Sequence, residues 1–473
     1  MPLHRLIPSI VYQKPYIRFS LFHLHSLPHR MSSLLQTITA PFRSSSTPKM
    51  VNREDVHYFG AGPAPLPTPV LESASKVLLN YNNTGIGLTE LSHRSAEANA
   101  ILAHTQSCLR KLLDIPESDG PDGYQILFLQ GGGSGEFSAV VYHMVSAWLG
   151  KLAKEKQQGL DQEAEKMKLD YLVTGSWSLK ASQEAARLVG SEHVNIVTDS
   201  RKARSNGKFG TIPKQDEWTP TKHTENVALT YYCDNETVDG VEFPSLPGSG
   251  DFPNLVADMS SNFLSRPINI RAHAAIFGGA QKNVGTTGIT LAIISNAILP
   301  PHASMAEPTL LRKLGLPNGP IVLDWPTISK NNSLYNTLPI FDVWIAGQVM
   351  QRLLDQSPAD KSPRITAQES ESNQKASLLY SALDSHPDTY HVVPDTAVRS
   401  RMNLCFRVRG GDEGVEKEFL KKAEAQGLLG LKGHRSVGGM RVSNYNAVPI
   451  AAVEKLAAFL VGFAKEVEGE DGK

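Results

Sequence analysis

The stretch "AHAAIFGGAQKNVGTTGITLAIIS", residues 272–295, places one lysine, Lys282, in a glycine-rich link between two apolar runs. The runs AHAAIF and ITLAIIS predict two short buried strands. A solvated lysine in a turn is the ordinary interpretation of such a residue. The alternative is a lysine that is used in chemistry, with the glycines allowing a flat ligand to approach the backbone closely. The short motif alone does not decide between the two.

Strands and helices alternate along the chain on the N-terminal side of this stretch. Apolar runs predict strands at residues 124–130, 170–177 and 193–199, and again in NVALTYYC and NLVAD. Helical patterns lie between several of them, including SAVVYHMV after the glycine turn GGGSGEF, and SLKASQEAARLV. This alternation indicates an α/β fold whose mostly parallel sheet is covered by helices on both faces.

Composition excludes several classes of protein. The 47 basic and 47 acidic side chains give a formal net charge of zero, so no global field favours nucleic acid or an anionic membrane. The three cysteines, Cys108, Cys233 and Cys405, are far apart, which argues against a disulfide framework or a zinc site. No apolar run reaches the roughly 18 residues typical of a membrane span.

The first 52 residues differ from the rest of the chain. They contain no Asp or Glu, while six Lys and Arg residues are scattered among Ser, His and Pro. This composition is typical of a mitochondrial transit peptide. A disordered tail, or an extension upstream of a later start at Met31 or Met50, explains it equally well. We expect a cytoplasmic protein, with a mitochondrial location as the alternative.

We expect three parts in the chain. Residues 1–52 form the extension, residues 53–338 the large α/β domain, and residues 339–473 a smaller α+β domain at the C-terminal end. Two charged stretches interrupt the pattern of the large domain. Residues 151–168 predict a solvated helix, and residues 199–225 a polar surface insertion. Near the start of the large domain, Thr68 is expected to cap a helix that has Pro69 at its first position.

Polar residues follow the predicted strands, at the edge of the sheet where ligands bind in parallel α/β folds. The turn GGGSGEF opens a helix, and its N–H groups would favour a phosphate, although such turns also serve only as turns. Asp258 ends one strand, as an ordinary cap or as the partner of a cationic ring nitrogen. Trp177 follows another strand, as a core residue or as a flat surface for stacking.

Together these features match the needs of pyridoxal 5'-phosphate. The cofactor requires a lysine for its Schiff base, an acid opposite its pyridinium nitrogen and a site for its phosphate. It also benefits from an aromatic face against its ring. Phosphate turn, Trp177, Asp258 and Lys282 occur in this order along the chain. Four weak signals in one consistent arrangement therefore favour a lysine that is used in chemistry.

Eight segments of the chain carry a resemblance to a known family: GPAPLP, ELSHRS, GGGSGEF, CDNETVDG, ADMSSNFLSRPIN, GGAQKNVG, YNTLP and GHRSVGGMRVSNYNA. They are similar to signature segments of the phosphoserine aminotransferase family of class-V, pyridoxal-phosphate-dependent aminotransferases. They extend over about residues 57–467. The resemblance implies a fold-type I enzyme and a homodimer with shared active sites, acting in L-serine biosynthesis. The implied reaction converts 3-phosphohydroxypyruvate and L-glutamate to O-phospho-L-serine and 2-oxoglutarate.

The resemblance also assigns roles to single residues. Lys282 corresponds to the Schiff-base lysine and Asp258 to the partner of the pyridinium nitrogen, and these two are the expected catalytic residues. The other expected cofactor contacts are Gly133, Ser134, Trp177, Thr237, Gln281, Asn336 and Thr337, of which Asn336 and Thr337 reach the cofactor phosphate of the partner subunit. The expected substrate contacts are Arg441 for the carboxylate and Arg94, His434 and Arg435 for the distal anion. No metal is expected.

Two other interpretations remain open from the sequence. The first is another aminotransferase of the same fold, such as an alanine–glyoxylate type, or a cysteine desulfurase. A desulfurase requires a cysteine in a mobile loop near the cofactor, and none of the three cysteines lies in a glycine-rich loop. The second is a catalytically inactive relative that serves as a binding protein. The presence of Lys282, Asp258 and Arg441 argues against it.

Overall fold

The computed structural model describes residues 51–156, 158–250, 252–356 and 365–470. The predicted N-terminal extension, residues 1–52, lies outside them except for its last two residues. Residues from Arg53 to Lys473 form one compact unit. Within the described residues, no helix is long and apolar enough to cross a membrane.

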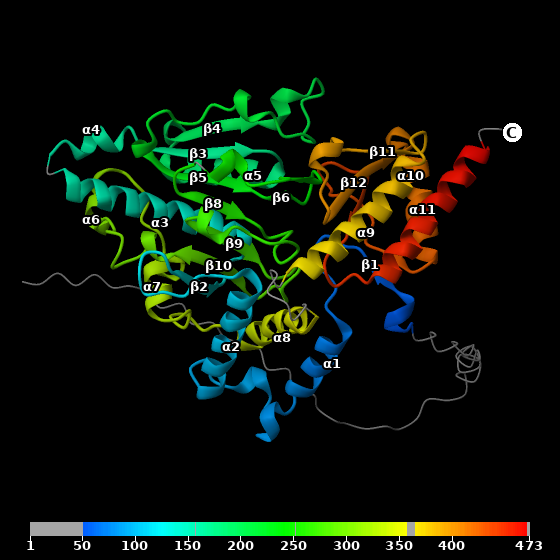
Figure 1. Cartoon of the computed structure of the whole chain (residues 1–473), viewed down its shortest axis with the longest axis horizontal. Helices are drawn as coiled ribbons and strands as arrows, with labels where there is room; N and C mark the ends of the chain where they lie inside the picture. Colours follow the sequence, from blue (N-terminus) through cyan, green and yellow to red (C-terminus); the bar gives the residue numbers. More distant parts are fainter. Residues whose placement is uncertain (1–50, 157, 251, 357–364, 471–473) are drawn as a thin grey trace, which may run out of the picture. The chain divides into compact units, whose positions relative to one another are not determined.

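A seven-stranded sheet forms the larger part of this unit (Figure 1). Its strands are β2 (Tyr124–Leu129), β3 (Lys168–Val173), β4 (Val194–Asp199), β5 (Val227–Cys233), β8 (Leu255–Asp258), β9 (Ala275–Gly279) and β10 (Thr290–Ser295). Their spatial order is β2-β10-β9-β8-β5-β3-β4, and β10 runs antiparallel to the other six strands. The predicted α/β class with a mostly parallel sheet is confirmed.

Helices cover both faces of the sheet, as the alternation predicted. One face packs against α1 (Thr68–Val77), α2 (Ala96–Leu113) and α8 (Ile340–Gln356), and the other against α3 (Gly132–Glu155), α5 (Ser176–Val189), α6 (Pro308–Lys313) and α7 (Trp325–Lys330). Strand β2 shows why the strands read as continuous apolar runs, since consecutive residues enter the cores on opposite faces of the sheet. Its residues Ile126 and Phe128 belong to the first core, whereas Leu127 and Leu129 belong to the second.

A second, three-stranded antiparallel sheet lies near the C-terminal end of the chain. It consists of β11 (Tyr390–Val392), β12 (Asn403–Val408) and β14 (Met440–Ser443), in the order β11-β12-β14. Helices α9 (Thr366–Asp384), α10 (Glu413–Ala425) and α11 (Ile450–Glu470) pack with it around a separate apolar core (Figure 1).

Two elements cross the expected boundary between residues 338 and 339. Helix α8 was assigned to the smaller domain, but it packs against α2 in the core of the large sheet. Strand β1 (His57–Tyr58) pairs in parallel with β13 (Leu428–Leu429), and the adjacent Phe59 is fully buried in the C-terminal core. The division into two domains at this boundary stays a prediction.

The local expectations were correct in part. The predicted cap of α1 was wrong by one residue, since the helix starts at Thr68 and its cap position is Pro67. Residues 151–168 do not form a single helix. They contain the end of α3, the short α4 (Leu160–Ala164) and the start of β3. Residues 199–225 contain only short 3-10 turns between β4 and β5.

Candidate active site

The catalytic candidates meet because neighbouring strands end at one edge of the large sheet. Cys233 at the end of β5 pairs with Asp258 at the end of β8, and Asp258 pairs with Phe277 of β9. The chain leaves β9 at Gly279 and enters the turn that carries Lys282. The structure therefore places the lysine turn next to the strand that ends in Asp258.

Lys282 is half-buried, and its amine donates a hydrogen bond of 2.9 Å to Thr237 Oγ1. Burial lowers the pKa of Lys282 to about 8, while the charge of Asp258 acts in the opposite direction. A larger share of the amine is thus neutral near pH 7 than in an ordinary lysine, whose pKa is about 10.4. Such an amine can accept a proton during turnover.

Asp258 is 5 % exposed, and its Oδ1 accepts a hydrogen bond of 2.8 Å from the backbone N–H of Ser260. Burial raises the pKa of this carboxyl group, whereas the hydrogen bond from Ser260 and the charge of Lys282 oppose the rise. The Cβ of any side chain at Gly133 would lie 4.0 Å from Asp258 Oδ2 and 3.5 Å from Ser260 Oγ. Asp258 and the glycine turn thus face the same space.

The glycine turn leads from β2 into α3. Gly131 and Gly132 have φ angles of 122° and 66°, which favour glycine, and α3 starts at Gly132. Gly133 and Ser134 lie in the first turn of this 24-residue helix. The first N–H groups of a helix have no partner within the helix and attract anions. This placement agrees with a phosphate site at Gly133 and Ser134.

Trp177 is positioned by two carboxylates that the sequence did not reveal. Its backbone N–H donates to Glu236 Oε2 at 2.8 Å, and the next N–H, of Ser178, donates to Glu236 Oε1 at 2.9 Å. The N–H of Ser176 donates to Asp239 Oδ2 at 2.7 Å. Both acids lie in the hairpin of β6 (Asn235–Glu236) and β7 (Val241–Glu242) or its turn, and they cap α5 across about sixty residues of sequence.

Thr237 connects the lysine with an arginine. While its hydroxyl accepts from Lys282, its backbone oxygen accepts a hydrogen bond of 3.2 Å from Arg441 Nη1. Arg441 belongs to β14 and is 9 % exposed, so its fork is largely shielded from water. Lys282 and the predicted substrate contact Arg441 are therefore both bonded to Thr237, itself a predicted cofactor contact.

His434 and Arg435 lie in the loop before β14. His434 is half-buried, and its Nδ1 lies 2.7 Å from Ser436 Oγ. Partial burial lowers the pKa of His434, and the positive charges of Arg441, Lys180 and Arg435 add to the effect. Arg435 is exposed. The positive charge of Arg441 thus acts on His434, while the contact that Arg435 makes with the substrate stays a prediction.

Arg94, Asn336 and Thr337 are exposed. Arg94 Nη2 donates to the backbone oxygen of Leu334 at 3.4 Å, and Asn336 Nδ2 donates to Gln130 Oε1 at 2.5 Å. No hydrogen bond within the described part of the chain joins these three residues to Lys282 or Arg441. Asn336 is thus bonded to the residue that precedes the glycine turn, and the roles of Arg94, Asn336 and Thr337 stay predictions.

The segment that contains Gly62 covers the lysine turn. The N–H of Ala64 donates to the backbone oxygen of Gln281 at 2.8 Å. The Cβ position of Gly62 lies 3.9 Å from the side chains of both Gln281 and Lys282. The predicted phosphate contact Gln281 is thus adjacent to the catalytic candidate and held by its backbone.

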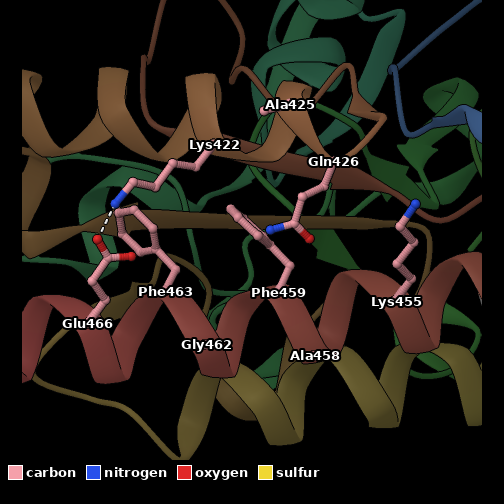
Figure 2. Close-up of a pocket in the computed structure, with 9 residues that line it drawn as sticks. All are labelled: Lys422, Ala425, Gln426, Lys455, Ala458, Phe459, Gly462, Phe463 and Glu466. Atoms are coloured by element: carbon pink, nitrogen blue, oxygen red, sulfur yellow. Dashed lines mark hydrogen bonds and ion pairs between the residues drawn. The ribbon is translucent and has the colours of Figure 1, made fainter.

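A surface groove of about 450 Å³ lies elsewhere, between α10 and α11 (Figure 2). Phe459 and Phe463 form its apolar part, and Lys422 pairs with Glu466 across it. It contains none of the predicted site residues. Lys455 is the further charged side chain of its lining, and we assign the groove no part in the chemistry.

The fold and the lysine–aspartate pair define a class of enzyme, and comparison with known proteins agrees. The model of the class-V aminotransferase family matches residues 171–456. Phosphoserine aminotransferase from Saccharomyces cerevisiae is 43% identical over 88% of this chain and 99% of its own. The Drosophila melanogaster enzyme of that name is 39% identical over 86% and 98%.

A solved structure extends the comparison to three dimensions. Phosphoserine aminotransferase from Trichomonas vaginalis, with bound pyridoxal phosphate, is 33% identical and has a TM-score of 0.71 over 86% of this chain and 99% of its own. The chain therefore belongs to the phosphoserine aminotransferase family of class-V, pyridoxal-phosphate-dependent aminotransferases.

The residues at the sheet edge fit this cofactor. The indole Nε1 of Trp177 is buried and has no hydrogen-bond partner among the described residues, so a polar neighbour is missing from its surroundings. Gly133 keeps the space beside Asp258 free of a side chain. An amine of lowered pKa, a buried carboxyl group and a helix N-terminus form the set of groups that the cofactor requires.

Proposed function

We propose that the protein transfers an amino group from L-glutamate to 3-phosphohydroxypyruvate, giving O-phospho-L-serine and 2-oxoglutarate, in L-serine biosynthesis. One observation carries the proposal. Thr237 accepts hydrogen bonds from both Lys282 and Arg441, so a proton acceptor and a carboxylate-binding fork lie on either side of one residue. A transaminase requires this combination, because the carboxylate must be fixed while a proton moves at the adjacent α-carbon.

Three groups would hold pyridoxal phosphate. The first turn of α3, with Gly133, Ser134 and Gln281 nearby, would bind its phosphate, and Trp177 would lie against its ring. Asp258 would keep its ring nitrogen protonated. When bound, the cofactor supplies an electron sink for the carbanion left at the substrate's α-carbon.

The protein's own residues perform the remaining tasks. Lys282 Nζ takes the α-proton of the substrate and returns a proton to the product, which its lowered pKa permits. Thr237 orients the amine through its hydroxyl. Arg441 binds the α-carboxylate that glutamate and the oxo-acid share, since a guanidinium group matches a carboxylate with two parallel hydrogen bonds.

The distal anion distinguishes the two natural substrates from simpler oxo-acids. Glutamate carries a second carboxylate and 3-phosphohydroxypyruvate carries a phosphate. His434, on which the charge of Arg441 acts, and its neighbour Arg435 would bind this group. The phosphate would also favour the protonated form of His434, against the lowered pKa of the free side chain.

In the homodimer that we propose, Arg94, Asn336 and Thr337 complete the partner's site. Their exposure, which leaves their side chains accessible to a second subunit, supports this assignment. We further propose a cytoplasmic location. The basic composition of residues 1–52 keeps mitochondrial import as the alternative.

A coupled assay tests the proposed reaction. Glutamate as donor is combined with 3-phosphohydroxypyruvate, pyruvate or glyoxylate as acceptor, and kcat/KM is measured for each. We expect the phosphorylated acceptor to be preferred by at least tenfold, the effect of about one charge-assisted hydrogen bond. Preference for glyoxylate would instead assign an alanine–glyoxylate type of activity, and no turnover with any acceptor would assign an inactive relative.

A further inference from the structure

Lys375 is a buried cation that the proposed mechanism does not use. It lies on α9 with 0 % of its surface exposed. Its Nζ donates to three backbone oxygens, of Tyr445 at 3.1 Å, Asn446 at 3.4 Å and Val448 at 2.8 Å. Glu371 Oε1 lies 3.6 Å away. Because a buried ammonium group requires acceptors, the loop between β14 and α11 is folded around this one side chain.

The same loop binds the residue that follows the catalytic candidate. The backbone N–H of Asn446 donates to Asn283 Oδ1 at 3.0 Å, and Asn283 Nδ2 donates to the backbone oxygen of Phe263 at 2.9 Å. The side chain of Asn446 donates to the backbone oxygen of Leu264 at 2.8 Å. Asn283 is therefore fixed between the loop and the segment after β8.

The loop also reaches the residue that precedes Lys282. The hydroxyl of Tyr445 donates to the backbone oxygen of Ala61 at 2.9 Å. Three residues later, the N–H of Ala64 donates to the backbone oxygen of Gln281 at 2.8 Å. Both chain neighbours of Lys282 are thus tied to the loop that Lys375 organises, one directly and one through residues 61–64.

We propose that Lys375 is a positioning residue for Lys282. Its ammonium group fixes the carbonyl groups of residues 445–448, and the loop transmits this order to the turn that carries Lys282. The catalytic consequence of this inference rests on the proposed role of Lys282. The mechanical link between the two lysines does not depend on that role. A role in stability alone is the competing explanation, and it predicts loosening of the C-terminal core without a specific effect on residues 280–285.

Hydrogen exchange of the holoenzyme separates the two explanations. Lys375→Met removes the charge at similar length, Lys375→Arg keeps it, and Lys422→Met removes a lysine from the α10–α11 groove as a matched control. In Lys375→Met we expect exchange at least tenfold faster in peptides that cover residues 445–448 and also in those that cover residues 280–285. The arginine and control variants should resemble the wild type in the second set of peptides.

The kinetic arm uses Asn283→Ala and the double variant Lys375→Met/Asn283→Ala. Each single variant should lower kcat by roughly ten- to a hundredfold with a smaller change of KM, since small displacements of a reacting group have effects of this size. The double variant should be little worse than the worse single variant, because both changes break one path. Additive losses would contradict the proposal.

Each remaining outcome is decisive. Fast exchange confined to residues 445–448, or failure of Lys375→Met to fold while Lys375→Arg folds, would assign Lys375 to stability and overturn the proposal. Fast exchange in residues 280–285 with unchanged kcat would support the mechanical link and count against the proposed role of Lys282. Loss of kcat in both single variants, with coupling in the double variant, supports both.

Discussion

Two features of the surroundings of Lys282 shift the pKa of its amine in opposite directions. Burial lowers its pKa, and the charge of Asp258 raises it, with a value of about 8 as the result. The hydrogen bond to Thr237 fixes the direction of the amine without neutralising it, because a hydroxyl group carries no charge. The same environment thus orients the lysine and keeps it able to exchange a proton.

Lys282→Ala should fold and bind pyridoxal phosphate without a covalent link, but lose turnover. Removing a general base typically costs about 10²- to 10⁴-fold in rate. The measurements are kcat with glutamate and 3-phosphohydroxypyruvate, and the peptide that retains cofactor after borohydride treatment of the wild type. Turnover above a few per cent of the wild-type rate without an added amine, or label on another lysine, would show that the assignment is wrong.

In Asp258→Asn, the pH at which the amine of Lys282 becomes reactive should be lower than in the wild type. Without the negative charge of Asp258 the ammonium form is less stable, so the pKa of Lys282 falls below its value of about 8. In cofactor-free protein, acylation of Lys282 should therefore rise with pH at a lower midpoint than in the wild type. Lys417, exposed on α10, is the internal control in the same digest. An unchanged or higher midpoint would contradict the electrostatic coupling.

Arg435→Ala should weaken 3-phosphohydroxypyruvate much more than pyruvate, which has no distal anion. A charge-assisted hydrogen bond is worth about 1.5–3 kcal/mol, so kcat/KM for the phosphorylated acceptor should fall roughly ten- to a hundredfold. Arg441→Ala is the matched variant and should impair both acceptors about equally. Equal losses with both acceptors in Arg435→Ala would remove the support for a phosphate site at this residue.

At the scale of elements, helix α5 depends on a hairpin far from it in sequence. Glu236 accepts from the backbone N–H groups of Trp177 and Ser178, and from the Ser178 hydroxyl at 2.6 Å. Glycine at the cap position, Gly175, has no side chain that could accept these bonds. The start of α5, and with it the indole of Trp177, is therefore fixed by the β6–β7 hairpin.

Glu236→Ala should destabilise the fold by about 1–2 kcal/mol, the usual effect of losing a helix cap. It should also weaken cofactor binding, because Trp177 loses its anchor. Glu236→Gln retains one acceptor oxygen and should lie between the alanine variant and the wild type. Thermal unfolding and the Kd for pyridoxal phosphate measure the two effects. A loss of stability with unchanged Kd would show that the cap does not position Trp177.

Sequence patterns predicted those elements whose signals are local. The strands around Lys282 were evident because each is a short apolar run next to glycine, and Asp258 because it ends such a run. Glu236, Asp239 and Lys375 were missed. Their partners lie tens of residues away, and no periodicity marks a carboxylate that caps a distant helix or a lysine whose helix face is buried. The misplaced cap at Thr68 has a simpler cause, since the proline on either side of it allows either assignment.

At the scale of the whole molecule, the predicted site divides into two groups. Lys282, Asp258 and Arg441 lie close together within one chain, whereas Arg94 and Asn336 are exposed, and their side chains donate hydrogen bonds to Leu334 and Gln130. Sequence similarity assigns both groups to one site. A dimer that shares its sites would unite them.

Mixing of inactive variants tests this arrangement. Lys282→Ala and Arg94→Ala are each expected to be impaired alone. If Arg94 serves the partner's site, a mixed dimer contains one site with both defects and one with neither. Refolding an equimolar mixture should then restore activity well above the sum of the separate variants, up to about one quarter of the wild-type rate for random pairing. No recovery, with dimers confirmed by light scattering, would place Arg94 in its own subunit's site.

The pairing of β1 with β13 has a consequence for biosynthesis. His57 and Tyr58 emerge from the ribosome long before their partners Leu428 and Leu429 are synthesised. Until then Phe59 has no core to enter, because the other residues of that core come from Leu379 onward. Closing a loop of this length is slow compared with forming local contacts. The large sheet can therefore assemble on the nascent chain, whereas the C-terminal core, and Arg441 with it, must await the synthesis of residues 379–464.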